Sequence, residues 1–218
     1  MIHPRIAFFV SLILLGASTR GSAVVIFTAE LTNSQEVPPV TPTTATGAPR
    51  PASFGFATFM LNDAMTALSF NATIFNIDVT GSQTVDANDN LRAAHIHAGP
   101  TGLPGMIAPV VWGFFGAPFN DNNPNDAVVT AFPAGSGLVG GTFSGKWDAP
   151  EGNNTTLTEQ LQHILAGRSY INFHTVQFGG GEIRGQITAV PEPSSIALAG
   201  IGAIGLIGYG WLRPRRAR

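Results

Sequence analysis

The sequence predicts an all-β fold, a Greek-key-like β-sandwich or barrel with one short helix, flanked by an N-terminal signal peptide and a C-terminal hydrophobic helix. Three observations support this expectation. Charged residues make up only 11% of the 218 residues whereas Gly (26) and Pro (16) are abundant, a composition that suits short strands joined by tight turns. Apolar residues recur with a period of two in the middle of the chain. One segment alone has the period of an amphipathic helix.

The clearest strand pattern lies between positions 67 and 74, where Leu68, Phe70, Ala72 and Ile74 alternate with polar residues. The apolar positions then change parity at 75, 77 and 79, which predicts a bulge or a new strand. The other segments with strand composition are 24–31, 54–61, 93–98, 109–115, 128–132, 138–147, 170–178 and 182–188. The last two are expected to form a hairpin around Gly179–Gly181.

The single helix is predicted over residues 157–166. Four apolar side chains share one face at helical spacing, and Gly167 follows the last turn as a C-terminal cap. These four residues are Leu157, Leu161, Ile164 and Leu165. We therefore expect one short helix packed against the sheet.

Cysteine content and charge narrow the classes of function. The chain has no cysteine, which excludes a disulfide scaffold and a Cys-ligated metal site. About 165 residues are nevertheless enough to bury a hydrophobic core. Five basic and twelve acidic residues lie between Val24 and Val190, giving this part a net charge of about −7. A domain this acidic is a poor binder of phosphates, so we expect no nucleic-acid partner.

The N-terminal 23 residues have the pattern of a signal peptide. A basic start ending at Arg5 precedes the apolar stretch 6–17, and Gly21 and Ala23 place small residues at the positions that precede a cleavage site. Cleavage is therefore expected after Ala23. A transmembrane anchor is the alternative, although twelve apolar residues are short for a bilayer.

The C-terminal end, residues 189–218, reads as a sorting signal. Pro191, Glu192 and Pro193 precede an apolar run at 196–212 and a terminal Arg cluster. The run predicts a transmembrane helix whose basic end stays in the cytoplasm, which places the middle domain outside the inner membrane. This three-part pattern resembles the PEP-CTERM sorting signal of Gram-negative bacteria. The resemblance implies cutting by an exosortase-type enzyme; a permanent single-pass anchor is the alternative.

Three histidines form the main candidate site. His95 and His97 are two positions apart in a predicted strand and therefore project to the same side, opposite Ile96. His174 lies opposite Phe173 in a second predicted strand. If the apolar residues face the core, the three rings gather on an outer face. Three imidazole nitrogens without sulfur suit copper(II) or zinc(II), so one copper or zinc ion is the predicted cofactor.

Glu182 and Arg184 share the parity of an outer face in the last predicted strand. We expect Glu182, or another acceptor, to hold one imidazole from behind, and Arg184 to pair with an acid. The alternative to a metal site is that the histidines are hydrogen-bonded surface residues that specify a loop.

The middle of the chain, residues 24–188, resembles the CHRD domain. The resemblance is carried in order by FTAELTNSQEVPPV (27–40), AAHIHAGPTGLPG (93–105) and YINFHTVQFGGGEIRGQI (170–187). It implies a β-sandwich-like fold and no settled biochemical activity. The HIHAGP stretch with a later strand histidine is also similar to the copper-site pattern of Cu/Zn superoxide dismutases, but a fourth ligand, the zinc-bridging residues and a cysteine are missing.

Together these features predict an exported bacterial protein, sorted to the cell envelope, surface or extracellular matrix. Its domain would be a non-enzymatic interaction or metal-binding module. The expected partners are an exosortase-type enzyme, the inner membrane for the tail, and surface or matrix components. The alternative is a secreted copper-dependent redox enzyme. The sequence suggests no nucleophile and base arrangement, so it does not point to a hydrolase.

Overall fold

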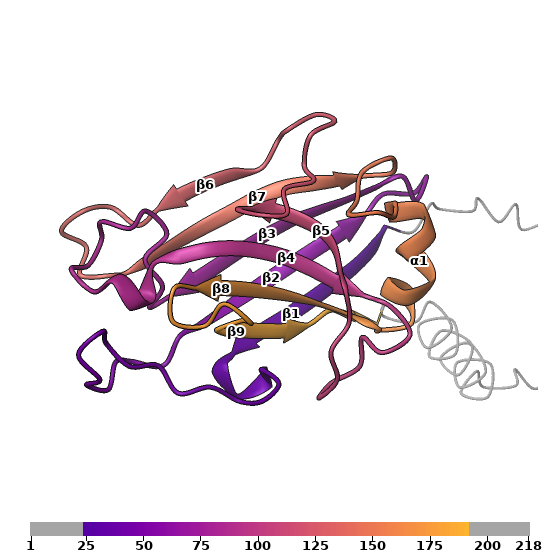
Figure 1. Ribbon diagram of the computed structural model, residues 1–218. Helices are drawn as coiled ribbons and strands as arrows, with labels where there is room; N and C mark the ends of the chain where they lie inside the picture. Colours follow the sequence, from indigo (N-terminus) through magenta and orange to yellow (C-terminus); the bar gives the residue numbers. More distant parts are fainter. Residues whose placement is uncertain (1–23, 192–218) are drawn as a thin grey trace, which may run out of the picture.

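The computed structural model describes residues 24–191, and most of their regular structure is β-strand (Figure 1). In chain order the elements are β1 (Val25–Thr32), the 3-10 turn η1 (Asn33–Gln35), β2 (Phe54–Leu61), β3 (Ala67–Phe75), η2 (Ala87–Asp89), β4 (Leu91–Ala98), β5 (Val110–Phe115), β6 (Val128–Ala131), β7 (Gly140–Asp148), α1 (Leu157–Leu165), β8 (Ser169–Thr175), β9 (Ile183–Gln186) and β10 (Thr188–Ala189). The predicted all-β class with one short helix is confirmed.

The strands form one antiparallel sheet that curls over on itself into a half-barrel. Their order is β5-β4-β8-β9-β1-β2-β3-β7-β6, with β10 added beside β1. In Figure 1 the strands β5, β4, β8 and β9 lie in front of the layer that runs from β1 to β6. The end strand β5 is thereby brought face to face with β7, the last strand but one at the other end: Trp112 of β5 stacks on Trp147 of β7, with ring centroids 5.7 Å apart.

The period of two in the sequence corresponds to the two faces of the sheet. Along β2, exposed and buried residues alternate over all eight positions. The buried side chains of β1, β2 and β3 meet those of β4, β5 and β8 across the curl. Aromatic rings dominate this contact: Phe70 of β3 lies 4.6 Å from Phe114 of β5 and 5.7 Å from Trp112, centroid to centroid. The aromatic content of the sequence therefore fills the space between the layers.

One detail of the predicted strands is wrong. The change of parity after Ile74 marks neither a bulge nor a new strand, because β3 ends at Phe75 and Asn76 has a φ of +63°. Ile77 and Val79 are buried in the loop that follows. Burial of a loop residue gives the same sequence signal as burial of a strand residue.

The helix begins with a capping box that the apolar spacing did not reveal. The Thr156 hydroxyl accepts from the Glu159 backbone N–H (3.3 Å), and the Glu159 carboxylate accepts from the Thr156 backbone N–H (2.9 Å). Leu157 and Ile164 are buried as expected. Leu165 is 43% exposed, so the buried face of the helix is narrower than the one predicted from the four apolar residues.

The predicted signal peptide and the predicted transmembrane helix at 196–212 both lie outside the described residues. Within residues 24–191, no helix has the length and apolar content needed to cross a membrane.

The central position of Phe70 leads to a stability prediction. Phe70 is 2% exposed and contacts rings from both layers, so Phe70→Ala leaves a cavity and should lower the free energy of unfolding by about 3–5 kcal/mol. Phe56→Ala is the matched control, because Phe56 lies on the neighbouring strand and is 55% exposed; about 1 kcal/mol or less is expected there. Urea unfolding measures both values. Equal losses in the two variants would contradict the proposed core.

Candidate functional site

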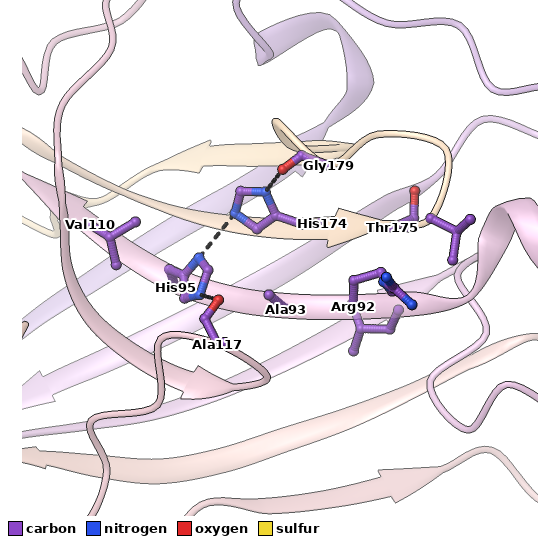
Figure 2. Close-up of a pocket in the computed structure, with 10 residues that line it drawn as sticks. Arg92, Ala93, His95, Val110, Ala117, His174, Thr175 and Gly179 are labelled. Atoms are coloured by element: carbon purple, nitrogen blue, oxygen red, sulfur yellow. Dashed lines mark hydrogen bonds between the residues drawn. The ribbon is translucent and has the colours of Figure 1, made fainter.

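The structure brings the three predicted histidines into one cluster. His95 and His97 project from β4 and His174 from the adjacent strand β8, where Ala93 pairs with His174 and His97 with Tyr170. One ring nitrogen from each histidine lies within 4.8 Å of those of the other two. The closest pair is His95 Nδ1 and His174 Nε2, at 3.2 Å (Figure 2).

Each ring is fixed from behind by a backbone carbonyl. His95 Nε2 donates to Ala117 O (3.1 Å), His97 Nδ1 to Ala108 O (2.9 Å) and His174 Nδ1 to Gly179 O (3.1 Å). A carbonyl oxygen only accepts, so the nitrogen that faces it carries the proton. In the neutral ring, the other nitrogen then has a lone pair. These three lone-pair nitrogens are His95 Nδ1, His97 Nε2 and His174 Nε2.

Burial keeps these imidazoles uncharged at neutral pH. It lowers the pKa of His95 to about 4 and the pKa of His97 to about 3, and it also lowers the pKa of His174. At pH 7 the neutral form therefore dominates. Between His95 Nδ1 and His174 Nε2 there is then no proton to share, and two lone pairs face each other at 3.2 Å.

The expected outer face is not an exposed one. Ile96 and Phe173 face the core, as strand parity predicts, but His95, His97 and His174 are only 4%, 8% and 7% exposed. The connections of the strands fold back over this face, and they carry the carbonyls of Ala108, Ala117 and Gly179 that bind the rings. Strand parity predicts the side of a sheet and not what covers it.

A stack of three side chains holds His97 in place. Its ring lies parallel to that of Tyr170, with centroids 4.6 Å apart. The guanidinium carbon of Arg184 lies 3.5 Å from the centroid of the same tyrosine ring. Because β8 runs between β4 and β9, Tyr170 is flanked by His97 on one side and Arg184 on the other. Arg184 donates to the carbonyls of Leu103 (2.9 Å) and Met106 (2.7 Å). It therefore binds carbonyls instead of the acid expected from the sequence. Its contact with the cluster is through the Tyr170 ring.

Glu182 also differs from its predicted role. Its fully buried carboxylate accepts from Arg50 Nη2 (2.6 Å), from the Thr175 hydroxyl (2.6 Å) and from the Ser53 hydroxyl, and among the described residues it bonds to no histidine. The physical reason is that buried Arg50, from the long loop after β1, supplies the opposite charge that a buried carboxylate needs. Glu182 therefore anchors that loop to the sheet.

The domain around this cluster matches a known family. A family model described as the CHRD domain matches residues 27–187, most of the chain. The chain belongs to the CHRD family. A second model, the PEP-CTERM protein-sorting motif, matches residues 189–216. This motif implies processing by an exosortase-type enzyme, and the chain is thus an exported protein sorted to the envelope or surface. No curated protein and no solved structure matches the chain.

A pocket of about 820 Å³ opens onto the cluster of this CHRD domain. His95 and His174 line it, together with Arg92, Val110, Ala117, Thr175, Gly179 and three further residues (Figure 2). His97 does not line the pocket. Two of the three lone-pair nitrogens thus belong to rings that a small molecule can approach.

Several parts of the CHRD site could not be found by looking for ligand-type residues. The acceptors are backbone carbonyls, which no side-chain motif records. Tyr170 belongs to the segment 170–187 that carries the family resemblance, but nothing in the sequence indicates that its ring stacks on that of His97. Gly113 pairs with His95 across β4 and β5, and a Cβ atom built there would lie 2.9 Å from Cδ2 of the His95 ring and even closer to the carbonyl oxygen of Pro118. Only glycine leaves room for both groups.

This close approach makes Gly113 testable. In Gly113→Ala either the loop at Pro118 or the His95 ring must move, and we expect a loss of about 1–3 kcal/mol in the free energy of unfolding together with shifted NMR signals of the His95 ring. Gly180→Ala is the control, because a Cβ atom there meets nothing within 4 Å. Identical stability and His95 signals in the two variants would contradict the packing described here.

Proposed function

We propose that the CHRD domain of this exported protein is a metal-binding module that holds one copper ion through His95, His97 and His174. The supporting observation is the arrangement of the six ring nitrogens. Three donate to backbone carbonyls, and the other three turn their lone pairs toward one another. Metal-bound histidines use their second nitrogen in the same way, which fixes the tautomer and the ring orientation.

Buried polar atoms in the cluster lack other partners. His97 Nε2 is buried and forms no hydrogen bond within the described residues. The facing lone pairs of His95 and His174 likewise gain nothing from each other in the neutral state. A cation placed among these three nitrogens would satisfy all of them, whereas leaving them unpaired costs about 1–3 kcal/mol per buried group.

The spacing is compatible with a single ion after small ring movements. With metal–nitrogen distances of ~2.0–2.1 Å, nitrogens bound to one ion lie at most about 4.2 Å apart. The 3.2 Å between His95 Nδ1 and His174 Nε2 corresponds to an angle of roughly 100° at such an ion, close to tetrahedral. Nitrogen ligands without sulfur suit copper(II) and zinc(II), and copper(II) generally binds more tightly.

The end segments fit a surface role for the module. We propose that residues 1–23 are removed on export, that residues 24–188 form the working domain, and that the segment from 189 keeps the protein at the inner membrane through its predicted helix until an exosortase-type enzyme processes it. The sorting motif match supports the last step. Surface or matrix components are then the partners that the domain meets.

The redox alternative needs a coordination position that a substrate can reach. The pocket beside His95 and His174 offers such space, so the copper-loaded protein should also be assayed for turnover of oxygen species. The binding role requires no such turnover.

Copper titration tests the site. The metal-free full-length chain should bind one Cu(II), and saturation at 100 times the Kd should add about 2.7 kcal/mol of stability. His97→Ala should weaken binding by about 100-fold or more, as should His174→Gln. Because His97 is buried against Tyr170, its removal should also cost about 1–3 kcal/mol, so folding is checked by circular dichroism. His163→Ala, on α1, is the control; unchanged affinity in both site variants would reject the proposal.

Sorting is tested separately in cells. Replacing Pro191, Glu192 and Pro193 by alanine should leave an unprocessed chain in the inner-membrane fraction, because the motif that the exosortase-type enzyme reads is gone. Fractionation and intact mass measure the outcome, with Val190→Ala as the neighbouring control. The same location and mass for the altered and original chains would show that the motif does not direct sorting.

A further inference from the structure

The pocket over the histidine cluster contains one formally charged side chain, that of Arg92. The other residues that line it are apolar, small or neutral. Within residues 24–191 the Arg92 guanidinium makes no hydrogen bond and no ion pair, although this part of the chain is strongly acidic. The Arg168 side chain, before the other end of β8, also lacks such a partner, whereas Arg50 and Lys146 pair with acids and Arg184 is bound to carbonyls. An exposed cation with no partner and two metal-ligand candidates therefore line the same pocket, with Arg92 beyond Ala93 from His95 along β4 (Figure 2).

A β-bulge gives Arg92 this position. Leu91 pairs with Thr175 and Ala93 with His174, so Arg92 is an extra residue without a partner on β8. Leu91 and Ala94 both belong to the hydrophobic core although they are three positions apart, which a regular strand does not allow. Without the bulge, Arg92 would share the core face of Ala94. Bulges commonly redirect a side chain next to a functional site.

The two histidines that line the pocket suggest what ligand Arg92 would meet there. His95 and His174 line the pocket and His97 does not, so a ligand in the pocket would approach an ion held by the three nitrogens from the side of His95 and His174. A ligand in this pocket shares it with the Arg92 side chain. Arginine binds carboxylates and oxyanions through its planar fork of N–H donors, and neutral groups gain less from it.

We propose that this pocket binds a small anion, which Arg92 holds while the anion occupies an open coordination position of the metal; this inference rests on the proposed metal site. The anion thus neutralises charge from two sides, the guanidinium and the ion. Arg92 is a binding residue of this pocket and takes no part in holding the metal.

The test uses the Cu(II)-loaded full-length chain and azide as the probe, followed by the copper charge-transfer absorption. Arg92→Gln should bind Cu(II) like the original chain and raise the azide Kd about fivefold, the upper range for one exposed charge pair. Added salt should weaken azide binding to the original chain more than to this variant. Imidazole, a neutral ligand, should bind both alike. Arg168→Gln is the control, because Arg168 is also exposed and precedes the opposite end of β8.

Each result decides between the two proposals. Weaker azide binding in Arg92→Gln alone supports the anion pocket. Copper binding without azide binding, equal azide affinity in the original chain and Arg92→Gln, or an equal loss in Arg168→Gln overturns the anion pocket and leaves the metal site standing. Failure of the original chain to bind Cu(II) overturns both.

Discussion

The antiparallel pairing of β4 with β8 is the constraint on which the rest of this domain depends. It joins segments about 80 positions apart in the chain and fixes which residues of each strand lie side by side. On one face, the register places Ile96 beside Ile171 in the core. On the other, it sets Ala93 beside His174 and His97 beside Tyr170, so a small residue leaves space for one ring and an aromatic residue stacks on another. A shift by one residue would turn both sets of side chains to the wrong face.

The face of β4 and β8 that carries the histidines is buried although it is polar, and this burial explains the protonation and hydrogen bonding of the three rings. A buried imidazole needs a partner for its N–H, and the strand connections that cover the face supply carbonyls for all three rings. The same loops exclude water from the rings. Because burial disfavours the charged form, the rings stay neutral and their second nitrogens remain acceptors. The donor set for a metal is thus a consequence of how the loops close over the sheet. The same loops leave one side open as the pocket.

The positively charged side chains of the domain also depend on this packing. The domain has few cations, and most are committed to the fold: Arg50 neutralises buried Glu182, and Arg184 ties the loop before β5 to Tyr170. Arg92 is an exception, because the bulge that spares the core from its guanidinium also turns it toward the pocket. In an acid-rich domain, a cation without a partner that shares a pocket with neutral rings reduces the repulsion of an anion there.

The sequence by itself determined the fold class, the strand boundaries within a few residues, the single helix and the parity of the histidines, since these follow from local periodicity and turn composition. It also supplied the family resemblance and the sorting signal. It did not determine that the histidine face is covered, that Glu182 pairs with Arg50, or that Arg92 is displaced by a bulge. Those features depend on contacts between loops and strands far apart in the chain. Periodicity reports only which side of a strand a residue takes, and the folded chain alone decides what lies opposite it.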